Sequence, residues 1–181
     1  IRYRNPAYVG DLINSLRIFN EKEVDEIAVV DISATRERRG PDFELINQMA
    51  SECFMPLAYG GGITTVREVE KIIKLGVEKV ILNSAALENI DLVRAAAASL
   101  GSQSVVVSID VKKRWLGGYG VYTRSGTRCM PSDLLRIVDM VTEAGAGELL
   151  LNAIDRDGTM LGYDHFLIKT VAARTHIPII S

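Results

Sequence analysis

The residues best suited to chemistry in this sequence lie in one short stretch, residues 152–162, which follows an apolar run. The stretch holds two carboxylates, an arginine, a hydroxyl group and two glycines within eleven residues. A loop that only reversed the chain would not need so many ionisable groups, so we interpret the stretch as part of a binding site. Its most useful groups are on Asp155, Asp157, Gly158 and Thr159.

A second set of candidates follows two other apolar runs. The glycines 60–62 precede a helix predicted to start at Thr64 and Thr65, and Asn83 and Ser84 end the next run. Glycine lets the backbone approach an anion, and the first N–H groups of a helix can bind phosphate. We therefore predict a phosphate site here, although a plain glycine turn is the alternative. Its predicted residues are Gly61, Gly62, Asn83 and Ser84.

The sequence from Asp157 to Thr159 could form a second anion site, together with a loop expected after residue 181. Two phosphate-binding positions on opposite sides of one active site would suit a long, bisphosphorylated substrate.

Asp110 is the best single candidate for proton transfer, because it ends a run of valines. A carboxyl group at a dry strand end can have a raised pKa and can donate a proton. The alternative is a carboxylate paired with Lys112 or Arg156. Asp31 and Asp155 could instead serve the structure through hydrogen bonds within their loops.

No metal site or cofactor is predicted. His165 and His176 follow no metal-ligand spacing, and Cys53 and Cys129 are far apart without a Cys-x-x-Cys motif. The cysteine usage therefore favours a reducing cytoplasm. The net charge of -2 gives no basic surface for nucleic acid, and no apolar run is long enough to predict a membrane span.

The elements that must position these residues alternate along the chain. Continuous apolar runs predict six strands, over residues 26–32, 55–59, 79–82, 104–109, 148–154 and 177–180. Apolar residues at helical spacing predict six helices, over residues 11–23, 42–51, 65–75, 90–100, 132–144 and 163–174. Such alternation predicts right-handed βαβ units and a parallel sheet. Residues 112–128 interrupt it and predict an inserted β-hairpin, either a binding surface or a solvated loop extension.

An internal repeat favours one architecture. Residues 26–35 parallel residues 148–159, so that Asp31 matches Asp155 and Thr35 matches Thr159. A (β/α)8 TIM barrel built from two similar halves explains the repeat, and its active site would lie at the carboxyl ends of the strands. Residues 1–181 would then be one incomplete barrel domain that lacks the first and last strands. Its open edges could cause self-association.

Four motifs make the sequence similar to one known family. Residues 58–63, 82–86, 101–110 and 152–164 resemble the cyclase subunit of imidazole glycerol phosphate synthase, and the similarity covers essentially the whole chain. The resemblance implies a (β/α)8 barrel that needs no cofactor. With ammonia from a glutaminase partner, this family converts a bisphosphorylated ribulosyl aminoimidazole nucleotide into imidazole glycerol phosphate and an aminoimidazole ribotide.

The resemblance also implies roles for particular residues. Asp110 would be one of two catalytic aspartates. Phosphate contacts would come from Gly62, Asn83 and Ser84 on one side, and from Asp157 and Gly158 on the other. The glutaminase would dock on the opposite face, where charged residues at the strand starts would ring the ammonia entrance. These predicted gate residues are Glu26, Lys79 and Glu148.

The sequence also departs from the family. It lacks the first-strand aspartate and the lysine of the following loop, so residues 1–181 are expected to be inactive alone, and Asn152 replaces the usual threonine. Residues 5–11 and 18–26 are closer to a paralogous group that amidates surface-polysaccharide sugars. The alternatives are thus this paralogue and, in another class, a catalytically incomplete barrel fragment that acts as an assembly module.

Overall fold

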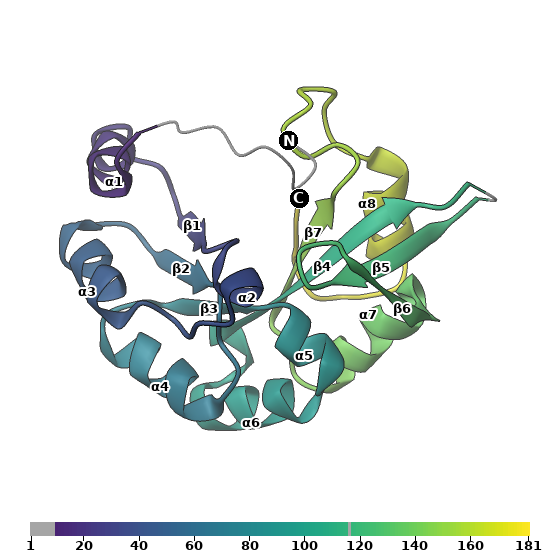
Figure 1. Cartoon of the computed structure of the whole chain (residues 1–181), viewed down its shortest axis with the longest axis horizontal. Helices are drawn as coiled ribbons and strands as arrows, with labels where there is room; N and C mark the ends of the chain where they lie inside the picture. The colour runs from purple at the N-terminus through teal and green to yellow at the C-terminus, as the bar shows by residue number, and fades with distance from the viewer. Residues whose placement is uncertain (1–9, 116) are drawn as a thin grey trace.

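The computed structural model describes residues 10–115 and 117–181. These residues form one eight-stranded sheet whose six parallel strands follow one another in chain order. Figure 1 shows the strands as an arc, with the long helices around its outside. The parallel strands are β1 (Ile27–Val30), β2 (Leu57–Gly60), β3 (Lys79–Leu82), β4 (Val105–Lys113), β7 (Glu148–Ala153) and β8 (Ile179–Ile180). The predicted α/β class with a parallel sheet is confirmed.

The long helices agree with the predicted ones apart from their ends. They are α1 (Leu12–Glu21), α3 (Phe43–Glu52), α4 (Val66–Lys74), α6 (Asp91–Leu100), α7 (Leu134–Glu143) and α8 (His165–Ala172). Three short elements were not predicted, namely α2 (Ala34–Glu37), α5 (Ser84–Glu88) and the 3-10 turn η1 (Ser102–Ser104). The helices α2 and α5 follow β1 and β3 directly, so they shape the loops at the carboxyl ends of those strands.

Acidic and hydroxyl side chains fix where the long helices begin. Asp11 and Thr65, the first residues of two predicted helices, accept hydrogen bonds from the backbone N–H groups of Asn14 and Glu68 and so act as N-caps. Such a side chain satisfies one of the N–H groups that the first helical turn leaves unpaired. The helices α3, α7 and α8 begin in the same way, at Asp42, Asp133 and Asp164.

Strand β4 is longer than predicted, because it continues past Asp110 to Lys113. From Asp110 to Lys113 it pairs antiparallel with β5 (Tyr119–Thr123). Strand β5 in turn pairs antiparallel with β6 (Arg128–Asp133). Residues 132 and 133, predicted to be helical, end β6 instead, and α7 starts at Leu134. Figure 1 shows β5 and β6 projecting beside the end of β4, next to the loop that follows β7.

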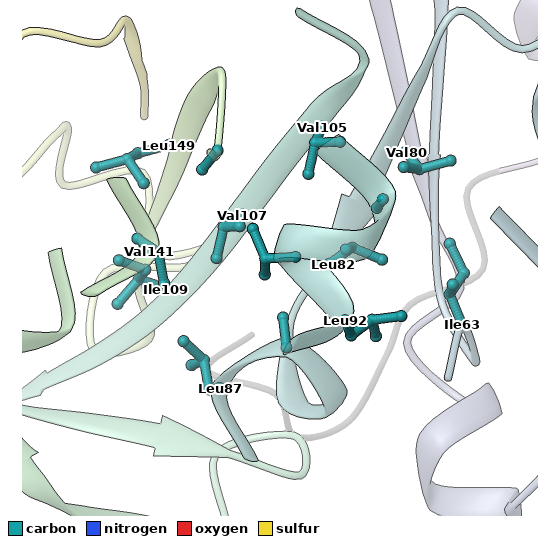
Figure 2. Close-up of a cluster of buried hydrophobic side chains, with 14 of the residues drawn as sticks. Ile63, Val80, Leu82, Leu87, Leu92, Val105, Val107, Ile109, Val141 and Leu149 are labelled. Atoms are coloured by element: carbon teal, nitrogen blue, oxygen red, sulfur yellow. The ribbon is translucent and has the colours of Figure 1, made fainter. Parts of the chain in front are cut away.

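The core has two parts, one on each face of the sheet. The larger part lies between the sheet and the helices, where Val80, Leu82, Val107, Ile109 and Leu149 are almost fully buried (Figure 2). Since side chains alternate along a strand, the residues between them point to the inner face. There, Ala58, Ile81 and Val106 form a small buried cluster with Leu150 against it. The inner face is therefore apolar at mid-sheet.

Strand β1 corrects one expectation. Its continuous run of apolar residues predicted burial on both faces, but the exposed residues alternate with the half-buried ones. Val30 is 45% exposed and Ile32, just after the strand, is 59% exposed. The reason is that β1 has one hydrogen-bonded neighbour, β2, among the described residues, and no described segment covers its inner face.

Candidate functional site

The predicted chemical residues lie at one edge of the sheet. The parallel strands β2, β3, β4 and β7 all run in the same direction, so their carboxyl ends meet at this edge. Gly61 and Gly62 follow β2, Asn83 follows β3, and Asp155 follows β7. Asp110 lies within β4, paired in register with Asn152 of β7. The sequence thus placed these residues on the correct side of the sheet.

Asp110 is buried on the inner face, with 4% of its surface exposed. Asn152 donates a hydrogen bond from Nδ2 to Oδ1 of Asp110 at 3.3 Å. The two cations considered as partners make other contacts: Lys112 Nζ donates to the carbonyl oxygen of Gly126, and Arg156 donates to those of Leu161 and Gly162. Asp110 is therefore a buried carboxyl group that accepts a hydrogen bond from the neighbouring strand.

Asn83 and Ser84 are held by a chain of hydrogen bonds. Asn83 Nδ2 donates to the carbonyl oxygen of Ser108 at 3.1 Å, and Ser84 Oγ donates to Asn83 Oδ1 at 2.9 Å. The backbone N–H of Arg124, in the turn between β5 and β6, donates to Ser84 Oγ at 2.8 Å. Ser108 and Asp110 are on the same face of β4, so this chain leads from the hairpin turn toward the buried carboxylate.

The glycines after β2 are required by close packing. A Cβ atom on Gly61 would lie 2.6 Å from the carbonyl oxygen of Asp31, and one on Gly62 would lie 2.7 Å from that of Arg39. Both residues also have positive φ angles, of 123° and 71°. This arrangement brings the β1–α2 loop against the backbone of Gly61, and the segment after α2 against that of Gly62.

The N–H groups just before α4 are satisfied within the chain itself. Glu68 Oε2 accepts hydrogen bonds from the backbone N–H groups of Thr64 and Thr65, at 2.8 and 2.9 Å. Burial would raise the pKa of Glu68, but these hydrogen bonds outweigh it and lower the pKa. Glu68 and Thr65 therefore form a capping box that fixes the start of α4 beside Gly61 and Gly62.

Asp31 serves its own loop. Its Oδ1 accepts from the backbone N–H groups of Ser33 and Ala34, and its Oδ2 lies 2.7 Å from an Arg39 nitrogen. Burial would raise the pKa of Asp31, but the hydrogen bonds from Ser33 and Arg39 outweigh it and lower the pKa. Asp31 is therefore a carboxylate that shapes the β1–α2 loop. This agrees with the alternative that it serves the structure through hydrogen bonds within its own loop.

The loop after β7 satisfies much of its own polarity. Thr159 Oγ1 donates to the carbonyl oxygen of Arg156 at 2.7 Å, and Arg156 donates in turn to those of Leu161 and Gly162. Asp155 Oδ2 accepts from the backbone N–H of Lys113 at 2.8 Å. Asp157 is half-buried, and Gly158 is exposed with a φ of 65°. Asp155 and Thr159 therefore shape the loop, while Asp157 and Gly158 stand at its tip.

The three charged residues predicted at the strand starts contact one another at the opposite edge of the sheet. Lys79 Nζ lies 2.9 Å from Glu26 Oε2 and 2.8 Å from Glu148 Oε1. Burial would lower the pKa of Lys79, but hydrogen bonds to Glu148 and Glu26 outweigh it and raise the pKa. The other oxygen of Glu148, Oε2, is buried without a hydrogen-bond partner among the described residues.

Two further features bear on function. Within the described ranges, no group of three or more His, Cys, Asp or Glu residues is arranged to hold a metal ion. None of the helices in those ranges is long and apolar enough to cross a membrane. Residues 5–9, part of the segment that suggested the sugar-amidation paralogue, lie outside the described residues.

Parallel strands, helices on their outer face, and polar side chains at their carboxyl ends are the features of the α/β-barrel enzymes. The comparison with known proteins is more specific. The family model described as "Histidine biosynthesis protein" matches residues 2–181, and the chain belongs to this family of (β/α)8 barrels. The predicted barrel class and family are confirmed.

Relatives within the family carry one recurrent name. The chain is 50% identical to the "Putative imidazole glycerol phosphate synthase subunit hisF2" of Pseudomonas aeruginosa, in an alignment that covers the whole of this chain and 72% of that relative. The chain is 39% identical to the imidazole glycerol phosphate synthase subunit HisF of Dictyoglomus thermophilum, in an alignment that covers 98% of this chain and 70% of that relative. The chain is 40% identical to the HisF subunit of Thermococcus gammatolerans, in an alignment that covers the whole of this chain and 71% of that relative. These names refer to the histidine pathway rather than to sugar amidation.

The close packing around Gly62 leads to a prediction that separates the cost of steric overlap from the cost of a left-handed backbone. Gly62 and Gly118 have nearly equal φ angles, of 71° and 74°, but an added Cβ atom finds nothing within 4 Å at Gly118. Gly118→Ala should lower the free energy of unfolding by about 1 kcal/mol, the cost of the left-handed backbone. Gly62→Ala should lower it by about 3 kcal/mol, because overpacking adds to that cost. Urea denaturation measures both, and equal losses would contradict the packing role.

Proposed function

We propose that this chain is the cyclase-type lyase subunit of an imidazole glycerol phosphate synthase. In this reaction, ammonia derived from glutamine and a bisphosphorylated ribulosyl aminoimidazole nucleotide give imidazole glycerol phosphate and an aminoimidazole ribotide. The observation that carries the proposal is the buried carboxylate of Asp110 on the inner face, aligned by Asn152. It lies on the strand between the two that carry the candidate phosphate residues. A cytoplasmic location is part of the proposal, and two free cysteines support it.

Asp110 is proposed to transfer protons during cyclisation. A carboxyl group in a place with little water can exchange a proton with a bound substrate without competition from solvent. Asn152 holds the carboxylate in one orientation through its amide, at the position where the family usually has threonine. Asparagine and threonine side chains can both donate a hydrogen bond, so asparagine at this position can still orient the carboxylate of Asp110.

Two sets of groups are proposed to bind the phosphates at the two ends of the substrate. Asn83 and Ser84 supply an amide and a hydroxyl on the β3 side, next to the backbone of Gly61 and Gly62. Asp157 and Gly158 contribute the tip of the loop on the β7 side. Asp157 is an acid, so its part would be to hold the loop while backbone N–H groups face the phosphate.

Ammonia is proposed to enter at the opposite edge of the sheet. There, Lys79 is held between Glu26 and Glu148, at the start of strands that lead toward Asp110. The inner-face residues between the two edges, Ala58, Ile81, Val106 and Leu150, are apolar. Neutral ammonia can pass such a surface, whereas ammonium would be disfavoured. A glutaminase subunit docked at this edge would deliver ammonia directly.

The role of Asp110 predicts a large effect from a small change. Asp110→Asn keeps the shape and the contact with Asn152 but removes the titratable proton. Measured in a chain that also carries the second catalytic aspartate, the cyclisation rate with ammonium salts should fall by about 10²–10⁴-fold, while the substrate still binds. Asp133→Asn, at the exposed N-cap of α7, is the matched control and should keep full activity. Normal turnover of Asp110→Asn would refute the proposed function.

Lys79→Met tests the proposed ammonia entrance in the complex with glutaminase. Turnover with glutamine should fall several-fold more than turnover with added ammonium, because only the first route needs the closed entrance. Lys74→Met is the control, since this lysine is exposed at the end of α4. Equal losses by both routes would show a purely structural role for Lys79.

Residues 1–181 alone are proposed to lack cyclase activity and to self-associate. The resemblance places a second catalytic aspartate on the first strand of the barrel, and no aspartate precedes Asp11 in the sequence. Among the described residues, the edge strands β1 and β8 each have one neighbour. Turnover of the purified piece with ammonium, or a monomer at all concentrations in light scattering, would contradict the respective half of this proposal.

A further inference from the structure

The turn between β5 and β6 contacts α5, although at least 35 residues separate the two along the chain. The backbone N–H of Arg124 donates to Ser84 Oγ across 40 positions of sequence. The guanidinium group of Arg124 binds both carboxylate oxygens of Glu88, with Nε–Oε1 and Nη2–Oε2 distances of 2.9 and 3.1 Å. Arg128 adds a contact to Glu88 Oε1 at 3.2 Å. Glu88 therefore anchors the turn from both of its ends.

The backbone of this turn needs such an anchor. Arg124 and Ser125 have φ angles of 53° and 56°, in the left-handed region where glycine and asparagine are favoured. Side chains with a Cβ atom are strained there, and hydrogen bonds from Thr127 to the carbonyl oxygens of Thr123 and Arg124 hold the turn from within. Contacts from outside the turn add to these bonds. The Glu88 ion pair does so at one side. At the other side, Lys112 Nζ donates to the carbonyl oxygen of Gly126 at 2.8 Å.

What the turn holds in place is the hydroxyl of Ser84. A hydroxyl group has one hydrogen to donate and two lone pairs to accept with. The N–H of Arg124 uses one lone pair, while the hydrogen points to Asn83 Oδ1. The oxygen thus keeps its position when its hydrogen turns from Asn83 to another acceptor. A phosphate oxygen is such an acceptor.

Electrostatics fit this arrangement. The hydrogen bond from Arg124 lowers the pKa of the Glu88 carboxyl, so Glu88 is ionised and its pair with Arg124 is charge-assisted. The ion pair is partly exposed, with 55% of the Arg124 side chain and 30% of that of Glu88 accessible. An exposed pair contributes little to overall stability. Its effect is therefore local, on the geometry of the turn.

We propose that Glu88 and Arg124 are positioning residues for the phosphate-binding pair Asn83 and Ser84. They act through the backbone N–H of Arg124 and do not touch the substrate themselves. The inserted strands thus belong to the site, because their turn completes one of its phosphate-binding walls. This inference rests on the proposed function, since it assigns a role to the phosphate site of that reaction.

The test compares Arg124→Met and Glu88→Ala with a matched control in the full protein. Arg94→Met removes an equally exposed arginine, 57% accessible, from its ion pair with Asp91 on α6. The two turn variants should raise KM for the bisphosphorylated substrate by about 5- to 10-fold with kcat changed less than about twofold, as for loss of one hydrogen bond in binding. The double variant should be no worse than either single one, and Arg124→Lys should restore part of the loss.

A second measurement does not depend on turnover. Inorganic phosphate is titrated while the amide signal of Ser84 is followed by NMR, and thermal unfolding checks that each variant is folded. The phosphate Kd should rise several-fold in Arg124→Met and Glu88→Ala and stay unchanged in Arg94→Met. Equal Kd and KM values in all variants, or a loss confined to kcat, would overturn the positioning role.

Failure of the proposed function has a different signature. If Asp110→Asn turns over normally, the cyclase assignment fails whatever the turn variants do. The phosphate titration then decides the positioning role alone, because a wild-type protein that does not bind phosphate at Ser84 overturns that role as well.

Discussion

The pairing of β4 with β7 is the constraint on which both ends of the proposed site depend. Six residue pairs are in parallel register, from Val106 with Glu148 to Val111 with Ala153. At one end this register brings Glu148 into reach of Lys79, and at the other it sets Asn152 beside Asp110. A shift by one residue would turn Asp110 toward the helices and bury a carboxylate in an apolar layer. The same backbone hydrogen bonds therefore fix both the proposed ammonia entrance and the proposed proton-transfer group.

The carboxyl edge of the sheet shows how stability and binding share the same backbone. At β2 the glycines are used to pack the β1–α2 loop, and Glu68 satisfies the start of α4. That arrangement stabilises the fold and ties up the N–H groups of Thr64 and Thr65 just before α4. At β3 the opposite holds, because Asn83 and Ser84 are positioned by contacts from distant elements. The proposed phosphate-binding groups thus lie where tertiary contacts, rather than local caps, hold the polar side chains.

Much of this could be predicted from the sequence, for reasons that are local. Continuous apolar runs gave the parallel strands, and Asp11 and Thr65 gave two helix starts. The exposure of Val30 could not be predicted, since the residues of β1 do not say whether a neighbour covers their inner face. The contacts of Arg124 with Ser84 and Glu88 have no local signature either. They arise only when the turn after β5 folds over α5.

The two similar halves of the sequence have diverged through their surroundings rather than their own residues. Asp31 and Asp155 hold matching positions after β1 and β7, yet Asp31 binds within its own loop while Asp155 accepts from Lys113 on β4. The extension of β4 that carries Lys113 exists because β5 pairs with it. The inserted strands therefore reach both walls of the site, Asp155 through Lys113 and Ser84 through Arg124. An approximately symmetric scaffold becomes an asymmetric site because one insertion binds one aspartate of the pair and leaves the other to its own loop.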